Sequence, residues 1–299
     1  MMSSHSRGLF MIGITALLWG VLAIVLQYSL HFLSVNAIIW FRFLLACIFL
    51  IIYYAIRDPS AFVILARPPI LGIIAGICIS GNYYGFTVGL DLTTPSNAQI
   101  LIQLSPLLVA AIGIFYFKER LTRLQVLGFS IAAIGFILFY WDQIHHLVTT
   151  QDRYFKGNLW VFFAAVCWAV FAVCQKVLLR IWTPLQTNLL FYIVASLLFT
   201  PYVNFKEFLN LTEWTQWAAL IFMAANTLIA YAALAEALRL LPANQVSAII
   251  VLNPLITLAV AAELSRRQIS WMPAENISLL GYLGALGLLI GVGFVVKKQ

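Results

Sequence analysis

Charge and cysteine are both scarce in this chain. Only 9% of its 299 residues are charged, whereas 63% are hydrophobic. A soluble domain carries about 25% charged residues, so this composition excludes an ordinary globular domain and a disordered chain. The four cysteines (Cys47, Cys78, Cys167 and Cys174) lie inside apolar stretches, without metal-ligand spacing or a secreted disulfide framework. We expect small buried side chains there, and neither a metal site nor a cofactor.

Long apolar runs make up most of the sequence. A hydrocarbon core of about 30 Å needs roughly 20 apolar residues per helix, and turn-forming pairs such as Thr94-Pro95 and Thr183-Pro184 separate the runs. The pattern predicts an all-α membrane protein with ten transmembrane helices and no separate soluble domain. The first run is too long for a signal-peptide core, so we expect it to be a retained helix. The expected helices cover residues 8–30, 34–56, 70–90, 96–117, 124–141, 158–180, 184–203, 214–238, 243–264 and 278–296.

Basic residues predict the orientation of these helices, because Lys and Arg stay preferentially in cytoplasmic loops. A cytoplasmic N-terminus gives the inner segments Arg7, Arg57, Arg67, Lys118, Arg120, Arg123, Lys176, Arg180, Arg239, Lys297 and Lys298. The outer segments then hold Arg153, Lys156, Lys206, Arg266 and Arg267. We expect a multi-pass inner-membrane protein with both termini in the cytoplasm. The scattered positions do not form the continuous basic face that nucleic-acid binding needs, so we expect no nucleic-acid partner.

The two halves of the chain, 1–150 and 151–299, resemble each other. Ala16-Leu17-Leu18-Trp19 aligns with Ala165-Val166-Cys167-Trp168, and Pro95-Ser96-Asn97 aligns with Pro242-Ala243-Asn244. Five helices per half is an odd number, so the second half is expected to enter the membrane upside down. Inverted repeats are typical of secondary transporters, whose site lies near the midplane between the halves. We therefore expect two inverted five-helix repeats around a central cavity.

Several of these segments resemble a known family. The Trp19-Gly20 pair, the Arg-Phe-Leu-Leu-Ala run at 42–46, the Pro-Ser-Asn turn at 95–97 and the segment 106–122 are similar, in type and order, to the EamA family of the drug/metabolite transporter superfamily. The resemblance covers essentially the whole chain. It implies export or exchange of small metabolites, with the fifth and tenth helices peripheral. The second half departs from the pattern, because nine positions separate Pro254 from Glu263 whereas thirteen separate Pro106 from Glu119.

Two prolines mark the expected site. Pro106 and Pro254 fall about ten residues into the fourth and ninth helices, where a proline removes a backbone hydrogen bond and kinks the helix. We expect them to act as hinges, and paired interruptions of this kind point to a transporter's binding site. The alternative is a pair of packing kinks. Polar side chains accompany both prolines and are expected to line the site: Gln99, Gln103, Ser247 and Asn253.

Further candidates lie near the middle of other helices: Asn82, Tyr83, Trp168, Tyr192 and Asn226. The asparagines also suit hydrogen bonding between helices, and the aromatic residues also suit packing or anchoring at the interface. Arg42 lies eight positions into the second helix, where a guanidinium is costly unless it faces a partner or a wet cavity. It suits a substrate carboxylate or, alternatively, backbone carbonyls and neighbouring rings.

Glycines at a spacing of four favour close helix packing. The stripe of Gly81, Gly85 and Gly89 on the third helix would allow sliding beside a cavity, whereas Gly287 and Gly291 on the tenth suit static packing or a dimer face. Glu236 is the one carboxylate well within a span, and an ion pair with Arg239 is expected there.

The sequence predicts a carrier of small metabolites, with amino acids or related carboxylates favoured. The expected carrier is an exporter or exchanger that works by alternating access, without covalent chemistry. We expect no catalytic residues and no enzyme activity, because no activated nucleophile, paired carboxylates or histidine cluster is placed for catalysis. A membrane-embedded enzyme and a structural or channel subunit remain the alternatives. The expected partners are a small-molecule substrate and the lipid bilayer, with the protein a monomer or homodimer.

Overall fold

A computed structural model describes residues 3–105, 108–109, 112, 118, 121–147, 152–250, 252–271 and 279–296, and all regular structure in this part of the chain is helical. The long helices follow the predicted ranges closely at most ends. Their bounds are α1 (Ser4–Ser29), α2 (Val35–Arg57), α4 (Ile70–Leu92), α5 (Pro95–Leu101), α7 (Arg123–Leu147), α8 (Asp152–Leu178), α9 (Pro184–Phe199), α11 (Trp214–Leu240), α12 (Ala243–Ile250), α13 (Asn253–Arg266) and α14 (Leu279–Val296). Short turns of helix connect some of them: η1 (Pro59–Phe62), α3 (Val63–Ala66), η2 (Thr200–Tyr202) and α10 (Lys206–Leu209).

Capping residues fix several of the helix starts. The Ser34 hydroxyl accepts the backbone N–H of Ala37 at the start of α2. Thr94 and Thr183 do the same for α5 and α9, and each is followed by a proline in the first turn. Proline is tolerated there because its missing N–H would have no helical partner. The turn pairs identified in the sequence therefore begin helices at the expected places.

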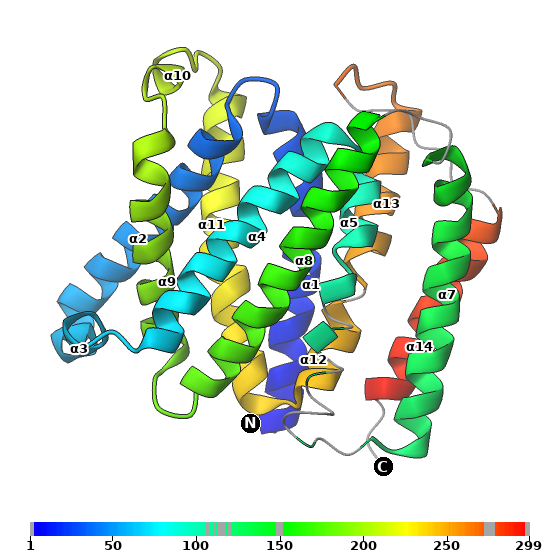
Figure 1. Ribbon diagram of the computed structural model, residues 1–299, viewed down its shortest axis with the longest axis horizontal. Helices are drawn as coiled ribbons and strands as arrows, with labels where there is room; N and C mark the ends of the chain where they lie inside the picture. Colours follow the sequence, from blue (N-terminus) through cyan, green and yellow to red (C-terminus); the bar gives the residue numbers. More distant parts are fainter. Residues whose placement is uncertain are drawn as a thin grey trace.

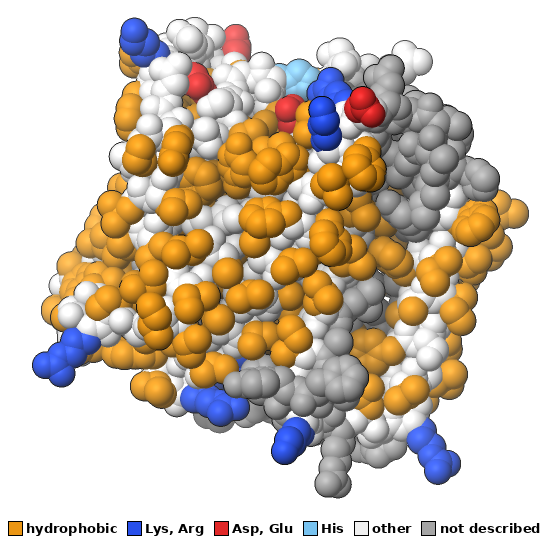
Figure 2. Space-filling view, in the orientation of Figure 1, with side chains coloured by type: hydrophobic (Ala, Val, Ile, Leu, Met, Phe, Trp, Pro, Cys, Tyr) orange, Lys and Arg blue, Asp and Glu red, His pale blue; other side chains and the backbone are white. Residues whose placement is uncertain are grey.

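Seven helical segments are long and apolar enough to cross a membrane, within the described residues. They are Ser4–Ser29, Val35–Arg57, Ile70–Leu92, Phe155–Leu178, Pro184–Tyr202, Trp214–Leu240 and Ala248–Arg266. Figure 2 shows a broad hydrophobic band across the molecule, with Lys, Arg, Asp and Glu confined to its two ends. The seven segments overlap seven of the ten predicted spans. The all-α membrane class is confirmed, whereas ten crossings in two repeats stay a prediction.

The long helices pack in pairs that join distant parts of the sequence. α1 packs along α11 and α13, whereas α4 packs along α8. We call the first group (α1, α11, α12 and α13) the α1 bundle and the second (α4, α5 and α8) the α4 bundle. α5 and α13 meet between them, and α2 packs along α9. α7 and α14 pack on each other at the side of the molecule (Figure 1).

Glycines make two of these pairings possible. A β-carbon at Gly85 would lie 2.7 Å from the carbonyl oxygen of Trp160, and one at Gly89 would lie 2.8 Å from that of Gly157, so the stripe faces α8. A β-carbon at Gly291 would lie 2.6 Å from the carbonyl oxygen of Gly128 on α7. The stripe on the tenth helix therefore packs within the chain and is not free to form a dimer face.

The helices expected over 96–117 and 243–264 are broken and not merely kinked. α5 ends at Leu101, and helical structure resumes at Leu104 after a turn. α12 ends at Ile250, and α13 begins at Asn253 with Pro254 in its first turn. A new helix start accommodates proline better than a kink, because the backbone N–H that proline lacks would have no helical partner in the first turn. Pro106 lies outside the described residues.

Candidate functional site

A cavity lies between the α1 bundle and the α4 bundle. The space free of protein atoms, its open side included, is about 580 Å³. Trp19 and Leu22 line it from the second half of α1, and Arg42 lines it from the first half of α2. Tyr231 lines it from the second half of α11, which starts at the end of the molecule where α1 ends, so the cavity lies near the middle of these helices (Figure 1).

Buried apolar side chains pack on both sides of the cavity along these helices. Ile12 and Ala16 precede Trp19 on α1, and Leu234 and Leu238 follow the cavity residue Tyr231 on α11. All four belong to one buried hydrophobic cluster. Toward the end where α1 ends, Leu26, Ile38 and Leu220 belong to a second buried hydrophobic cluster.

Arg42 is the charged residue among the cavity's lining side chains. It is 2% exposed, and its Nε donates a hydrogen bond of 3.1 Å to the hydroxyl oxygen of Thr227. The centre of its guanidinium lies 4.3 Å from the centroid of the Tyr83 ring, a cation–π contact. Within the described residues, no carboxylate lies at ion-pair distance from Arg42. The guanidinium is held in place but its charge has no opposite partner there.

Thr227 fixes this arrangement from α11. Its hydroxyl donates to the carbonyl oxygen of Met223 at 2.9 Å and accepts from both Arg42 and the Tyr83 hydroxyl, the latter at 3.3 Å. A hydroxyl has one donor and two acceptor positions, so its hydrogen bonding is complete. The Tyr192 hydroxyl donates to the Thr227 carbonyl at 2.9 Å. The guanidinium's remaining N–H groups are therefore not used by Thr227.

Gln99 of α5, and Gln103 and Ser105 after it, contribute two amides and a hydroxyl to the cavity wall. Gln99 donates to the carbonyl of Trp19 at 2.8 Å, which ties the two bundles together. Gln103 donates to the carbonyl of Gln99 at 3.1 Å. Its Oε1, the Ser105 hydroxyl and the Thr87 hydroxyl have no hydrogen-bond partner in the described part of the chain. These three buried groups belong to residues that line the cavity and leave acceptor capacity there.

Aromatic rings form much of the remaining wall. The Trp19 and Trp168 centroids are 5.9 Å apart in a T-shaped arrangement, and Trp19 lies 5.2 Å from Tyr231. Tyr83 lies 5.9 Å from Tyr231, and Phe86 is the next aromatic residue on the same helix to line the cavity. The cavity thus combines one cation, a few polar groups and an apolar wall, as small-molecule sites do.

Comparison with known proteins assigns the family. The model of the EamA-like transporter family matches residues 6–141 and 155–297. The chain belongs to the EamA-like transporter family. It is a membrane transporter of the EamA type, as its apolar helices and the resemblance at 95–97 and 106–122 indicate.

Relatives of this EamA chain carry transporter names. It is 33% identical to "Uncharacterized inner membrane transporter YhbE" of Escherichia coli K12, over 93% of this chain and 87% of the relative. It is 28% identical to an "Uncharacterized transporter" of Haemophilus influenzae, over 93% and 90%. It is 24% identical to a "Probable amino-acid metabolite efflux pump" of Salmonella typhimurium, over 97% and 96%. A crystal structure at 19% identity shares the fold, with a TM-score of 0.72 and 98% of each chain covered.

Most of the residues predicted to bind substrate in this EamA chain meet at the cavity. Those that line it are Arg42, Asn82, Tyr83, Gln99, Gln103, Trp168 and Asn253. Asn253 also joins α13 to α1 within the α1 bundle: with its amide in the orientation that satisfies both amide atoms, its nitrogen donates to the Ala16 carbonyl at 2.9 Å. The Ser247 side chain lies outside the described residues. That the seven cavity-lining residues bind substrate stays a prediction.

Two of the predicted residues do not line the cavity. Asn226 donates to the carbonyl of Leu18 at 2.7 Å, so its amide joins α11 to α1. Tyr192 is 1% exposed, and its hydroxyl donates to the carbonyl of Thr227, the residue whose hydroxyl accepts from Arg42. Asn82 makes a similar bond to the Ala164 carbonyl at 2.9 Å, although it also borders the cavity. Asn226 and Asn82 thus each donate a hydrogen bond from one helix to another, which is the alternative role considered for them.

Thr87, Ser105 and Tyr231 also line the cavity, although they are not among the substrate-binding residues predicted from the sequence. Helical spacing gives a signal for two of them: Thr87 is four residues after Tyr83, and Tyr231 is four after Thr227. Ser105 lies next to Pro106, at the break.

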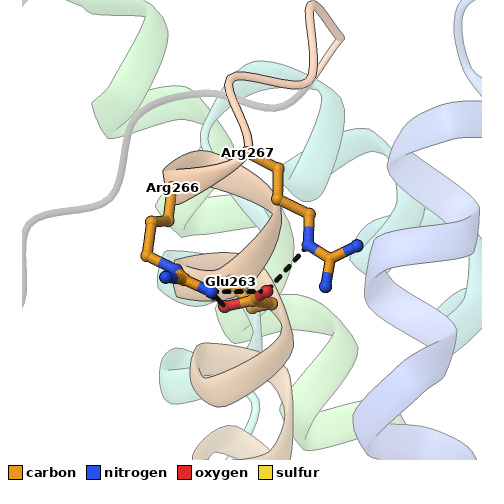
Figure 3. Close-up of polar contacts among 3 residues, drawn as sticks. All are labelled: Glu263, Arg266 and Arg267. Carbon is orange, nitrogen blue, oxygen red and sulfur yellow. Dashed lines mark hydrogen bonds and ion pairs between the residues drawn. The ribbon is translucent and has the colours of Figure 1, made fainter.

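The acidic residues of the spans do not line this cavity. Glu236 pairs with Arg239 at 2.6 Å, as expected, and also with Arg7 at 3.1 Å. Near the end of α13, Glu263 pairs with Arg266 at 2.8 Å and Arg267 at 2.7 Å (Figure 3). Both carboxylates are thus paired with arginines near the C-terminal ends of their helices, α11 and α13.

Proposed function

We propose that this EamA protein is a secondary transporter that exports or exchanges small metabolites with a carboxylate, amino acids first among them. The observation that carries the proposal is Arg42, a buried cation that faces a cavity and has no carboxylate partner in the described part of the chain. A buried charge is costly unless it is paired. A substrate carboxylate supplies the missing charge and accepts from the guanidinium in a bidentate geometry.

The rest of the cavity supports a substrate that is also a donor and partly apolar. Gln103 Oε1 and the hydroxyls of Ser105 and Thr87 suit the N–H groups of an ammonium. The rings of Trp19 and Trp168 suit an apolar or aromatic side chain. A zwitterionic amino acid has all three features. The Salmonella relative named as an amino-acid metabolite efflux pump is in keeping with this class.

The proposed mechanism is alternating access by rocking of the α1 bundle against the α4 bundle. Each bundle takes helices from both halves of the chain, and the cavity lies between them. The hydrogen bond from Gln99 to the Trp19 carbonyl crosses that interface and must rearrange in the cycle. The helix break at 102–103 and the one between the end of α12 and the start of α13 supply the points of flexure, and Pro254 lies in the first turn after the second.

Two inverted five-helix repeats, residues 1–150 and 151–299, belong to the same proposal. The family model matches the chain twice, once in each half. The third span of each half packs along the first span of the other half: α4 along α8 and α11 along α1. A two-fold relation between the halves would produce this exchange.

The proposed location is the inner membrane, with both termini cytoplasmic. The Escherichia coli relative is named an inner membrane transporter. α1 begins and α14 ends at the same end of the molecule (Figure 1). On the face in Figure 2, that end carries Lys and Arg side chains whereas the opposite end carries both signs.

Counterflow in proteoliposomes tests the transporter proposal. The full chain is reconstituted, loaded with unlabelled amino acid, and given the labelled amino acid outside. We expect saturable, transient accumulation for at least one amino acid from a panel of apolar and aromatic side chains. Flux without saturation or exchange would favour the channel alternative. An enzyme would consume the solute, which mass spectrometry of the vesicle contents detects; the transporter names of the relatives speak against that outcome.

A further inference from the structure

The described residues leave one cation and several polar groups of the cavity without a partner. Arg42 is 2% exposed, and no carboxylate in the described part of the chain lies at ion-pair distance from it. Gln103 Oε1 and the Ser105 hydroxyl are buried and have no hydrogen-bond partner among the described residues. The cavity wall thus carries a positive charge without an opposite charge, together with acceptors without a donor.

Titration near neutral pH does not remove the charge of Arg42. A guanidinium keeps its proton in proteins. The titratable side chains near it are tyrosines from three helices packed on α2: Tyr83 (α4), Tyr192 (α9) and Tyr231 (α11). Tyrosine is neutral near pH 7, so these three residues supply no negative charge. The described carboxylates do not line the cavity, so the opposite charge has to come from a solute.

A charge of this kind affects how a carrier changes sides. Alternating access passes through a state in which the site is closed to both sides of the membrane. Water solvates the guanidinium when the cavity is open but not when it is closed, and a buried charge is costly unless it is paired. A zwitterionic solute supplies a carboxylate for Arg42 and an ammonium for the acceptors. The loaded carrier therefore closes at a lower cost than the solute-free carrier.

Given the amino-acid carrier proposed above, we propose that the protein is an obligate exchanger, in which Arg42 prevents the solute-free carrier from changing sides. One amino acid leaves only when another enters, so the gradient of one drives the transport of the other. The exchange of two zwitterions moves no net charge. It also needs no proton gradient, because no described side chain that lines the cavity gains or loses a proton near neutral pH.

Release from proteoliposomes tests this coupling on the full chain. Vesicles are loaded with a labelled amino acid, and its release is measured with and without the unlabelled amino acid outside. A large sulfonate replaces chloride, so that no small anion pairs with Arg42. A hydrogen bond that involves a charged group corresponds to a factor of roughly 10 to 150. We therefore expect external amino acid to accelerate release at least about tenfold, whereas the corresponding amide, which has no carboxylate, should not.

Substitutions at Arg42 connect the coupling to its charge. Arg42→Gln closes without a buried cation, so external amino acid should no longer accelerate its release. Arg153→Gln is the matched control and should keep the wild-type acceleration, because Arg153 is exposed and donates to the Asp91 carbonyl. A buried lysine loses its proton readily. Arg42→Lys should therefore stay coupled at low pH and lose the coupling as the pH is raised, whereas the wild-type coupling should not change.

The outcomes separate the coupling from transport itself. Equal release with and without external amino acid in wild type would overturn obligate exchange, while saturable counterflow would still support a carrier. An unchanged acceleration in Arg42→Gln would overturn the role of Arg42. Absence of counterflow for every amino acid tested would remove the proposed transport function, and obligate exchange with it.

Discussion

Replacement of Arg42 by glutamine should remove the protein's ability to distinguish a carboxylate from an amide. The guanidinium lies at the cavity with one hydrogen bond to Thr227 and one ring contact, and its other N–H groups have no partner in the described residues. A hydrogen bond that involves a charged group contributes about 1.5–3 kcal/mol. That range corresponds to a factor of roughly 10 to 150 in affinity. The amide of the same amino acid lacks the negative charge and forfeits this contribution.

The assay compares half-saturating concentrations in counterflow for an amino acid and its amide. The ratio of the two values does not depend on how much folded protein each preparation contains, and the lost contact with Thr227 cancels from it. We expect a ratio of at least about 10 for wild type and a ratio near one for Arg42→Gln. Arg153→Gln is the control, because Arg153 is exposed and donates to the Asp91 carbonyl far from the cavity. An unchanged ratio in Arg42→Gln would refute the role of Arg42 in carboxylate recognition.

Three further substitutions test the packing around the cavity by thermal unfolding in detergent. Gly89→Ala should destabilise the protein by about 1–3 kcal/mol, because its β-carbon would collide with Val161 and lie 2.8 Å from the Gly157 carbonyl oxygen on α8. Gly13→Ala, with open space around it, should be neutral or slightly stabilising, and equal effects of the two substitutions would contradict the packing. Asn226→Ala should lose its bond to the Leu18 carbonyl and lower stability by about 0.6–1.7 kcal/mol with unchanged half-saturation; a raised half-saturation would place it in the site. Arg42→Met should not lower the unfolding temperature, because it removes a buried cation without an acidic partner in the described residues; a large drop would show that the cation is structural.

Much of the fold could be predicted because a membrane constrains each helix separately. Span length, turn residues and prolines are local signals. The structure begins α9 at Pro184, after Thr183, and begins α13 one residue before Pro254. The kink predicted at Pro254 was wrong, because one helix ends and another begins there. The sequence does not distinguish the two, since a kink and a break differ only in the hydrogen bonding of the turn before the proline. In the structure, Leu252 N–H bonds to the Ile249 carbonyl at 3.0 Å, which ends α12.

The candidate site could be predicted in part, for a physical reason. Arg42, Gln99 and Gln103 carry their own signal, because polar groups in a span must face a wet or paired environment. Asn226 carries the same signal, but its amide nitrogen bonds to the Leu18 carbonyl on α1, and nothing local reveals that α11 packs along α1. Tyr231 was missed because a tyrosine in an apolar helix has no such cost. Pairing between the halves decides which polar residues reach the cavity.

Thiol labelling at the cavity from each side of the membrane tests alternating access most directly. Ile102 lines the cavity at the break after α5, so Ile102→Cys, with the four native cysteines replaced, reports on access. Alternating access requires that a membrane-impermeant maleimide reach this thiol from one side of the membrane in the solute-free protein. Saturating amino acid should then make it reactive from the opposite side as well. Reaction from one side only, whatever solute is present, would contradict a carrier built on this cavity.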